Sequence, residues 1–259
     1  MTVDSSPDII LAEGIAKRYG PVVALRDTTI RLGRGEVLGL IGDNGAGKST
    51  LIKILTGFHP PDQGTLFIDG DEVELRSVSH ARQLGIETVY QDLALVDQLP
   101  VYLNMNLNKE RVRRPLPFLD KKRMRDEARA HLDDMGVRIP SVDTDVGFLS
   151  GGQRQAVAIA RAVYSDAKVI LLDEPLAAMG SKESTIIIDL ILELKQRGEV
   201  SMILIAHNFA QVLEVCDRVN LLQHGRITYE KAVGDTSIQE LTELVAAEYR
   251  GRGNPQHDN

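Results

Sequence analysis

The stretch IGDNGAGKST, residues 41 to 50, holds three glycines, one lysine and two hydroxyl side chains in ten positions. So few apolar side chains are atypical of a core segment. Its spacing fits G-x-x-x-x-G-K-[ST], a loop whose backbone N–H groups wrap phosphates and whose lysine meets the β and γ oxygens. The fixed positions are Gly42, Gly47, Lys48 and Ser49. We therefore predict a site for a nucleoside triphosphate.

The residues around this loop have the strand and helix character that the motif requires. EVLGLIG (36 to 42) is a short apolar run, and KSTLIKILTG (48 to 57) carries apolar residues at helical spacing. A plain turn is the alternative, but it leaves the full motif unexplained. We expect Lys48 to contact phosphate and Ser49 to coordinate Mg²⁺. The predicted nucleotide-binding residues are Gly42, Asp43, Asn44, Gly45, Ala46, Gly47, Lys48, Ser49 and Thr50.

Composition limits the class of protein. The chain has 259 residues, 43% hydrophobic and 26% charged, and its net charge of −7 disfavours a nucleic-acid partner, although a local basic patch is compatible with it. The single cysteine, Cys216, excludes an internal disulfide and suits a small buried side chain. The N-terminal stretch has no secretory-signal pattern, and no apolar run approaches the roughly 20 residues of a membrane helix. We expect a cytoplasmic protein that meets a membrane only through a partner.

The first half of the chain predicts an antiparallel sheet followed by a helical insert. DIILAEGIAKRYG and VALRDTTIRLGRG are expected to form strands, GTLFIDGDEVEL (64 to 75) a hairpin, and IETVYQ (86 to 91) a further strand. From about residue 92 to 150 the β-branched runs stop. A helix is predicted there, with an apolar stripe of Met124, Ala128, Leu132 and Met135.

Buried strands and capped helices follow the insert. Ser150 is expected to cap a helix, and KVILLDE (168 to 174) and SMILIAH (201 to 207) are apolar enough for strands buried in a parallel sheet. Ser181 and Gly198 mark the expected ends of another helix. A further helix and strand, a helical tail and a polar end that we expect to be disordered complete the chain. This alternation predicts an α/β fold.

Polar groups come directly after the predicted strands. Ligands of open parallel sheets gather beyond the carboxyl ends of the strands, so these groups are expected to converge on one edge. They are the phosphate loop, Gln91, Asp173 with Glu174, and His207.

Each of these groups has a possible role in catalysis or metal binding, and each also has a purely structural alternative. Adjacent carboxylates repel and lose hydration together, so Asp173 and Glu174 are expected to be used, the alternative being an ion-paired surface turn. We expect Asp173 to hold Mg²⁺ and Glu174 to polarise the attacking water. His207, otherwise a structural histidine, can hydrogen-bond the γ-phosphate or that water. Gln91, otherwise an exposed glutamine, is a candidate ligand to Mg²⁺ or water.

LSGGQ, residues 149 to 153, predicts a second anion site. Gly151 and Gly152 expose backbone amides at the positive end of a helix dipole, although a capped helix start with two flexible glycines is the alternative. This grip lies about a hundred residues after the first. Two anion sites for one nucleotide suggest that the two sites belong to different subunits.

GDNGAGKST, LSGGQRQ, VILLDEP and His207, in this order, resemble the ATP-binding subunit of ATP-binding cassette (ABC) transporters over nearly the whole chain. In that family the signature of one subunit closes over the nucleotide of the other. The resemblance therefore implies a dimer, and it adds Ser150, Gly151, Gly152 and Gln153 to the nucleotide-binding residues. It also implies that Tyr19 stacks on adenine, the alternative being a core tyrosine, and that Gln91 links the nucleotide to the membrane partner.

The resemblance implies a P-loop NTPase (RecA-like) parallel sheet core with a flanking antiparallel β subdomain and an α-helical insert subdomain. We expect one ABC ATPase domain over residues 1–259. Its expected parts are the core with the antiparallel subdomain, 1–91 and 163–235, the helical subdomain with the signature, 92–162, and a C-terminal helix and polar tail, 236–259.

GIETVYQDLAL, with the phosphate loop and its helix, resembles the ATPases of ribose, xylose and fructose importers. That implies ATP hydrolysis that powers an integral permease for a monosaccharide, at the inner face of the membrane and indirectly with a sugar-binding protein. Two positions depart from the family: Leu176 stands where Ser or Thr is usual, and Gly180 where many members have Asp. The basic stretch Arg111 to Arg114 is either part of the permease-docking surface or a solvated charged loop.

Two other functions are alternatives. A non-transport cassette protein that acts on ribosomes or DNA would be expected to carry paired cassettes, long coiled-coil inserts or basic arms, which this sequence lacks. A kinase with the same phosphate loop would need an acceptor-binding segment and would leave LSGGQ unexplained.

Overall fold

The computed structural model describes residues 8–113, 118–177 and 179–252. Its centre is a six-stranded sheet in the order β12-β11-β3-β10-β9-β6, parallel except for the antiparallel β11–β12 pair. The strands are β3 (Val37–Ile41), β6 (Ile86–Val89), β9 (Val169–Asp173), β10 (Ser201–Ile205), β11 (Arg218–Gln223) and β12 (Arg226–Ala232). The predicted α/β core is confirmed.

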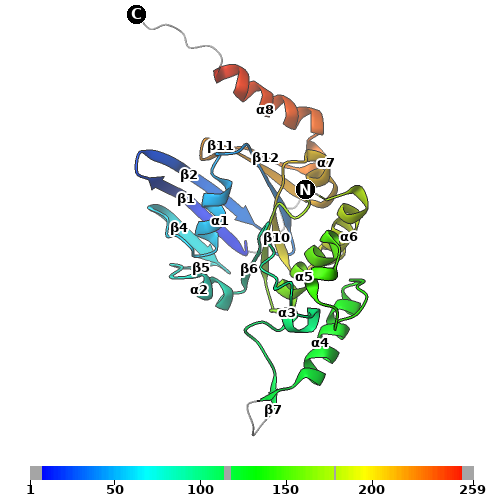
Figure 1. Ribbon diagram of the computed structural model, residues 1–259. Coiled ribbons are helices and arrows are strands. Elements are labelled where there is room, and N and C mark those ends of the chain that lie inside the picture. Colours follow the sequence, from blue (N-terminus) through cyan, green and yellow to red (C-terminus); the bar gives the residue numbers. More distant parts are fainter. Residues whose placement is uncertain (1–7, 114–117, 178, 253–259) are drawn as a thin grey trace, which may run out of the picture.

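The central strands are apolar at nearly every position because both faces of the sheet are covered. In β9, Leu171 faces one apolar cluster while its neighbours Ile170 and Leu172 face the other. Helix α1 (Lys48–Leu55) and the antiparallel sheet cover the first face. Helices α5 (Gly151–Tyr164), α6 (Ser181–Arg197) and α7 (Phe209–Val215) cover the second (Figure 1).

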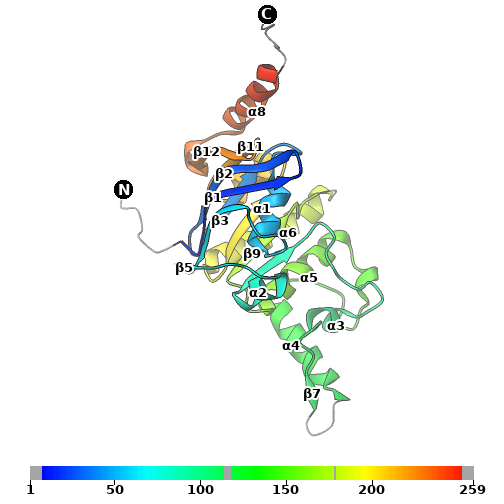
Figure 2. The same ribbon diagram turned by 90° about the vertical axis from the view of Figure 1, so that its left-hand side faces the viewer.

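The antiparallel sheet predicted before and after the phosphate loop is present. Its order is β2-β1-β4-β5, with α1 between it and the central sheet (Figure 2). The strands are β1 (Ile10–Tyr19), β2 (Val22–Leu32), β4 (Gln63–Ile68) and β5 (Asp71–Glu72), followed by the short helix α2 (Val78–Gln83).

The segment after β6 carries the predicted helix and buries its stripe. It holds α3 (Val101–Met105), α4 (Lys121–Asp134) and a 3-10 turn, η1 (Val146–Phe148), before α5. Met124, Ala128, Leu132 and Met135 are all at most 2% exposed, which confirms that face of α4. A small hairpin of β7 (Val112–Arg113) and β8 (Phe118–Leu119) projects from this segment (Figure 1).

The structure corrects several sequence-based expectations. β6 ends at Val89, so Gln91 lies two residues beyond the strand. Ser181 does not cap α6: it is the first helical residue, and Gly180 occupies the cap position without a side-chain bond. The hairpin β7–β8 and the edge strand β12 were not predicted, because β7 and β8 have two residues each and β12 is half exposed.

The C-terminal part follows the expected order. Cys216 is buried, as predicted, and a turn, η2 (Val233–Asp235), leads to α8 (Ile238–Arg252). Its polar continuation, residues 253–259, which we expected to be disordered, lies outside the described residues. Within the described residues, none of the helices combines the length and apolar character needed to cross a membrane.

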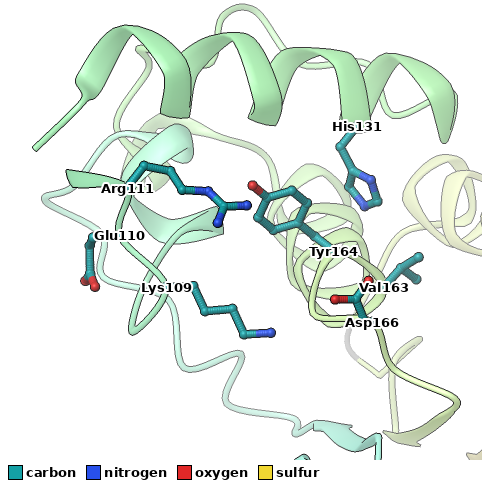
Figure 3. A pocket seen from close by; sticks show the side chains of 7 residues that line it. All are labelled: Lys109, Glu110, Arg111, His131, Val163, Tyr164 and Asp166. Carbon is teal, nitrogen blue, oxygen red and sulfur yellow. The ribbon is translucent and has the colours of Figure 1, made fainter. Parts of the chain in front are cut away.

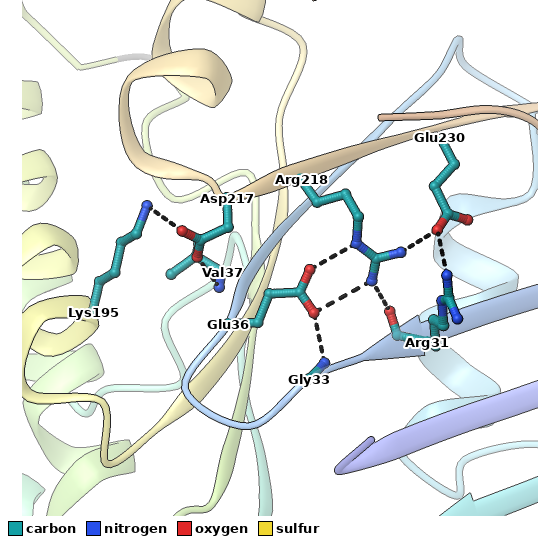
Figure 4. A network of polar contacts seen from close by, with 8 residues as sticks. All are labelled: Arg31, Gly33, Glu36, Val37, Lys195, Asp217, Arg218 and Glu230. Carbon is teal, nitrogen blue, oxygen red and sulfur yellow. Dashed lines mark hydrogen bonds and ion pairs between the residues drawn. The ribbon is translucent and has the colours of Figure 1, made fainter. Parts of the chain in front are cut away.

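A polar network fixes the start of β3, the strand that leads into the phosphate loop (Figure 4). The Arg218 guanidinium lies 2.8 Å from Glu36 Oε1, donates to the Arg31 carbonyl at 2.6 Å and pairs with Glu230. On the other side, Val37 N donates to the Asp217 carboxylate at 2.9 Å. The network ties β2, β3, β11 and β12 together at the end of the sheet opposite the predicted site.

Candidate nucleotide site

Three glycines give the phosphate loop its shape. Gly42, Gly45 and Gly47 have φ angles of 151°, 85° and 114°, a region that favours glycine. A Cβ on Gly42 would lie 2.2 Å from the Leu222 carbonyl oxygen, and one on Gly47 would lie 2.5 Å from the Ala24 carbonyl oxygen. The loop is therefore wedged between β11 and β2. Gly42 and Gly47 are required by space as well as by conformation, whereas Gly45, with nothing within 4 Å of a Cβ, is required by conformation alone.

Lys48 folds back beneath the loop. Its side chain is buried at the start of α1, and Nζ donates to the carbonyl oxygens of Gly42 at 2.5 Å and Asp43 at 3.0 Å. Burial lowers the pKa of this ammonium, while the carboxylates of Glu174, Asp43 and Asp173 raise it. A single cation thus lies among three acids at the point where the motif predicts phosphate.

Asp173 and Glu174 stand at the end of β9, facing this cation. Burial raises the pKa of Asp173, the negative charge of Glu174 raises it further, and Lys48 and His207 lower it. Glu174 adopts φ 52°, which is rare for a residue with a side chain, and its N–H donates to the Ile205 carbonyl at 3.0 Å. Backbone strain of this kind clusters at functional sites because the surrounding structure must enforce it.

His207 meets Glu174 across the strand ends. Its Nε2 lies 2.6 Å from Glu174 Oε1, a short contact that joins the residues after β10 and β9. β9 and β10 are parallel neighbours, with Asp173 opposite Ile205, so the two side chains leave the same edge of the sheet. The predicted convergence of Lys48, Asp173, Glu174 and His207 is what the structure contains.

Gln91 joins the same neighbourhood from the other side. It lines a cavity of about 390 Å³ together with Glu174, Gly151 and Glu183. The cavity brings three residues predicted for the site, Gln91, Glu174 and Gly151, to one space between the central sheet and α5. Glu183, in the first turn of α6, was not predicted, because nothing in the sequence marks its packing against α5.

The signature segment forms a capped helix start. Ser150 Oγ accepts from Gln153 N at 3.3 Å, and Ser150 N donates to Gln153 Oε1 at 3.0 Å, so Ser150 caps α5 as predicted. Gly152 packs closely on α6, because a Cβ there would lie 3.1 Å from Glu183 Cβ and would require a small shift of that residue. Across the described part of the chain, no hydrogen bond or ion pair joins residues 150–153 to residues 42–50. Within one chain, the two predicted anion sites are thus not joined by a described hydrogen bond or ion pair.

Tyr19 lies near the phosphate loop and is not a core residue. It is 41% exposed at the end of β1 and pairs with Val22 on β2, two residues before the Ala24 carbonyl that touches Gly47. Its side chain is therefore accessible to a ligand.

The two departures from the family pattern have different surroundings. Leu176 is 7% exposed and belongs to the apolar cluster beneath α5 and α6. Gly180 has nothing within 4 Å of the position that a Cβ would take. The structure therefore explains an apolar side chain at 176, and nothing in it requires glycine at 180.

Comparison with known proteins decides the family. The family model described as ABC transporter matches residues 25–177, a span that includes the phosphate loop, the signature and Glu174. The chain belongs to the ABC transporter family. The cassette is 44% identical to a xylose/arabinose import ATP-binding protein of Sulfolobus acidocaldarius, over 95% of this chain and 97% of that one. A fructose import ATP-binding protein of Rhizobium meliloti is 45% identical over 84% and 86%.

Longer relatives and solved structures agree with this assignment. A ribose import ATP-binding protein of Chromobacterium violaceum is 36% identical over 96% of the cassette but only 49% of its own length, so that relative is about twice as long. The ADP conformation of an ATP-binding cassette of an ABC transporter superposes with a TM-score of 0.78 at 26% identity, covering 93% of this chain and 96% of that one. The cassette is thus a nucleotide-binding ATPase of the ABC type, and the resemblance found in the sequence is confirmed.

Proposed function

We propose that the cassette is the ATP-hydrolysing subunit of an importer for a monosaccharide. The observation that carries the hydrolytic part is the contact of 2.6 Å between Glu174 and His207 at the sheet edge where Lys48 is buried. The sugar part is supported by the relatives, which are named as import proteins for xylose and arabinose, fructose and ribose.

The donor set suits Mg²⁺ held together with phosphate oxygens. Ser49 offers an exposed hydroxyl, Asp173 a half-buried carboxylate and Gln91 an amide oxygen, all hard oxygen donors of the kind that Mg²⁺ prefers. Within the described ranges no group of three or more His, Cys, Asp or Glu side chains could hold a metal unaided. That fits a cation bound through one carboxylate and the substrate's phosphates. When bound, Mg²⁺ would neutralise charge on those phosphates.

The side chains around this position can bind the phosphates and direct water. Lys48 and the amides of the phosphate loop hold the β and γ phosphates, and the Glu174 carboxylate accepts a proton from the water that attacks γ-phosphorus. His207 fixes the Glu174 carboxylate through the hydrogen bond at 2.6 Å. A positioned general base contributes about 10²- to 10⁴-fold to rate.

Two copies of the cassette are proposed to share two nucleotides. The amides of Gly151 and Gly152 start a helix of 14 residues, α5, and such a helix end attracts anions. Because no hydrogen bond or ion pair joins the signature to the phosphate loop within the described residues of one chain, a nucleotide held by one loop is proposed to receive the signature of a second copy. ATP binding would then close the dimer, and hydrolysis would reopen it.

The permease is proposed to dock on the helical segment after Gln91. The hairpin there exposes the cross-strand pair Val112 and Leu119 at 54% and 41%, and Phe118 at 67%; exposed apolar side chains that gather on one small element mark a candidate protein contact. Beside it lies a polar pocket of about 590 Å³ lined by Lys109, Arg111 and Tyr164 (Figure 3). Arg111 pairs with Glu127 at 3.0 Å, so it also braces the segment. Arg114 lies outside the described residues.

Docking on a permease would place the cassette at the inner face of the membrane, with a sugar-binding protein acting on the opposite side. The experiment is to tag the chain and purify it from its native membrane after mild solubilisation. A polytopic permease and a sugar-binding protein in the eluate, together with ATP-dependent uptake of a sugar by vesicles carrying that permease, are the expected results. Ribosomal or DNA-bound proteins in their place would overturn the transport role.

A further inference from the structure

The exposed end of β1, which carries Tyr19, is fastened to the loop that follows α1. Asp62 holds it with both carboxylate oxygens: Oδ1 lies 2.7 Å from Lys17 Nζ, and Oδ2 accepts from Arg18 N at 2.7 Å. Asp62 N also donates to the Ala16 carbonyl at 2.9 Å. One aspartate therefore bonds to three consecutive residues directly before Tyr19.

Lys17 is held as firmly as the aspartate. Its Nζ also donates to the Pro60 carbonyl at 2.7 Å, and its side chain is only 12% exposed. The hydrogen bond from Lys17, and after it the one from Arg18 N, lower the pKa of Asp62, so this carboxylate is ionised at neutral pH. Surface ion pairs add little to global stability. The consequence of this cluster is therefore local: it fixes the backbone at the end of β1.

A row of rings supports the Tyr19 side chain from the same loop. The His59 ring meets Tyr19 edge to face, with centroids 5.7 Å apart and planes at 65°, and Phe58 packs on His59 at 4.8 Å and 79°. The backbone N–H groups of Phe58 and His59 both donate to the Lys53 carbonyl at the end of α1. The rings that support Tyr19 are thus hydrogen-bonded through their backbone to α1, the helix that begins at Lys48.

We propose that Asp62 is a positioning residue for base recognition, which fixes the end of β1 so that Tyr19, supported by His59, presents its ring to adenine. The inference rests on the proposed ATP-binding function and on the contact between Tyr19 and adenine that the family resemblance implies. A ring that is already in place loses less conformational freedom on binding. The bonds from Asp62 to residues 16–18, which we call the Asp62 clamp, therefore improve affinity for the base although Asp62 does not contact the base. The phosphates are held by other residues and are unaffected.

The test is to titrate Asp62→Ala with Mg·ATP and, separately, with inorganic tripolyphosphate. Loss of the clamp should raise the Kd for ATP by about threefold to tenfold, a part of what stacking on an aromatic ring contributes to base binding. The Kd for tripolyphosphate should stay within about twofold, because that probe has no base. An equal loss for both ligands would mean that Asp62 acts on the whole site, and it would overturn the inference.

Asp69 provides a matched control on the same pair of strands. Its carboxylate also holds two cations, Arg34 at 2.6 Å and Lys168 at 2.7 Å. The register of β1 and β4 places it at the opposite end, beyond Ile68, about 20 Å from Asp62 by strand rise. Asp69→Ala should change neither Kd, which separates loss of this clamp from loss of a surface ion pair in general.

Tyr19→Ala separates this inference from the function on which it rests. If Tyr19→Ala weakens ATP and tripolyphosphate equally, the proposed base contact is wrong and the inference falls with it. If Tyr19→Ala is selective for ATP but Asp62→Ala is not, only the inference is wrong. The double variant should bind ATP as weakly as Tyr19→Ala alone, because each change removes the same contribution, the stacking of the Tyr19 ring on the base. Additive losses would contradict a positioning role.

Discussion

Replacing Lys48 by alanine should weaken ATP binding by about ten- to 150-fold. The ammonium is buried and donates to two loop carbonyls, at 2.5 Å and 3.0 Å, which leaves its third N–H for a phosphate oxygen. A hydrogen bond between charged groups contributes about 1.5 to 3 kcal/mol, and each 1.4 kcal/mol is a factor of ten in Kd. Those values give the expected range.

The structure places the result in the upper half of that range. Lys48 is the cation that Asp43, Asp173 and Glu174 face, so its removal leaves these acids to oppose the incoming phosphates. Isothermal titration of the purified variant with Mg·ATP measures the effect. Lys53→Ala is the control, since Lys53 lies on the same helix but is exposed. A Kd within twofold of the parent for Lys48→Ala, or an equal loss in Lys53→Ala, would refute the reasoning.

Three further changes test the site and the fold. His207→Ala should lower kcat by about ten- to 100-fold in a phosphate-release assay with little change in ATP affinity, because Glu174 loses a charge-assisted hydrogen bond; an unchanged kcat would contradict this role. Gly42→Ala should abolish ATP binding in a titration, since its Cβ would lie 2.2 Å from a carbonyl oxygen, whereas Gly180→Ala, with open space around it, should be neutral. Glu127→Gln should lower stability by about 1 kcal/mol at pH 7 in urea unfolding. The pKa of Glu127 is raised by burial, but hydrogen bonds from Arg123, Arg111 and Tyr164 bring it to about 2, so the difference should shrink as pH falls below about 4.5 and be lost as pH falls through about 2.

The sign of the Glu127 prediction follows from linkage. A carboxyl group whose pKa is lower in the folded state stabilises that state above its unfolded pKa, and this contribution is lost as pH falls through the folded pKa. A gap between parent and variant that is as large at pH 2 as at pH 7 would contradict the assignment. The partial exposure of Glu127 keeps the expected effect small.

The site could be predicted from the sequence because each of its parts follows a buried strand. Asp173, Glu174 and His207 come directly after apolar runs, and parallel strands end at one edge, so their meeting needed only the neighbouring positions of β9 and β10. The phosphate loop was recognisable because two fixed positions of its motif, Gly42 and Gly47, leave no space for a side chain. Local patterns of this kind are visible without a structure.

The parts that were missed depend on contacts between distant segments. Glu183 packs on Gly152 from 31 positions away, and Asp62 holds Lys17 from 45 positions away. β12 was missed because its residues alternate between exposed and half-buried at the sheet edge, which leaves a weak apolar pattern. Ser181 is a residue type that often caps helices. Helix α6 nevertheless begins at Ser181 itself, and the cap position is Gly180.

The central claim is that ATP closes two cassettes into a dimer and that Glu174 then drives hydrolysis. Glu174→Gln keeps the size of the side chain but removes the carboxylate that His207 contacts at 2.6 Å. Light scattering of this variant should record one chain with ADP and two with Mg·ATP, while phosphate release stops. A single chain under both conditions, or undiminished hydrolysis, would contradict the claim.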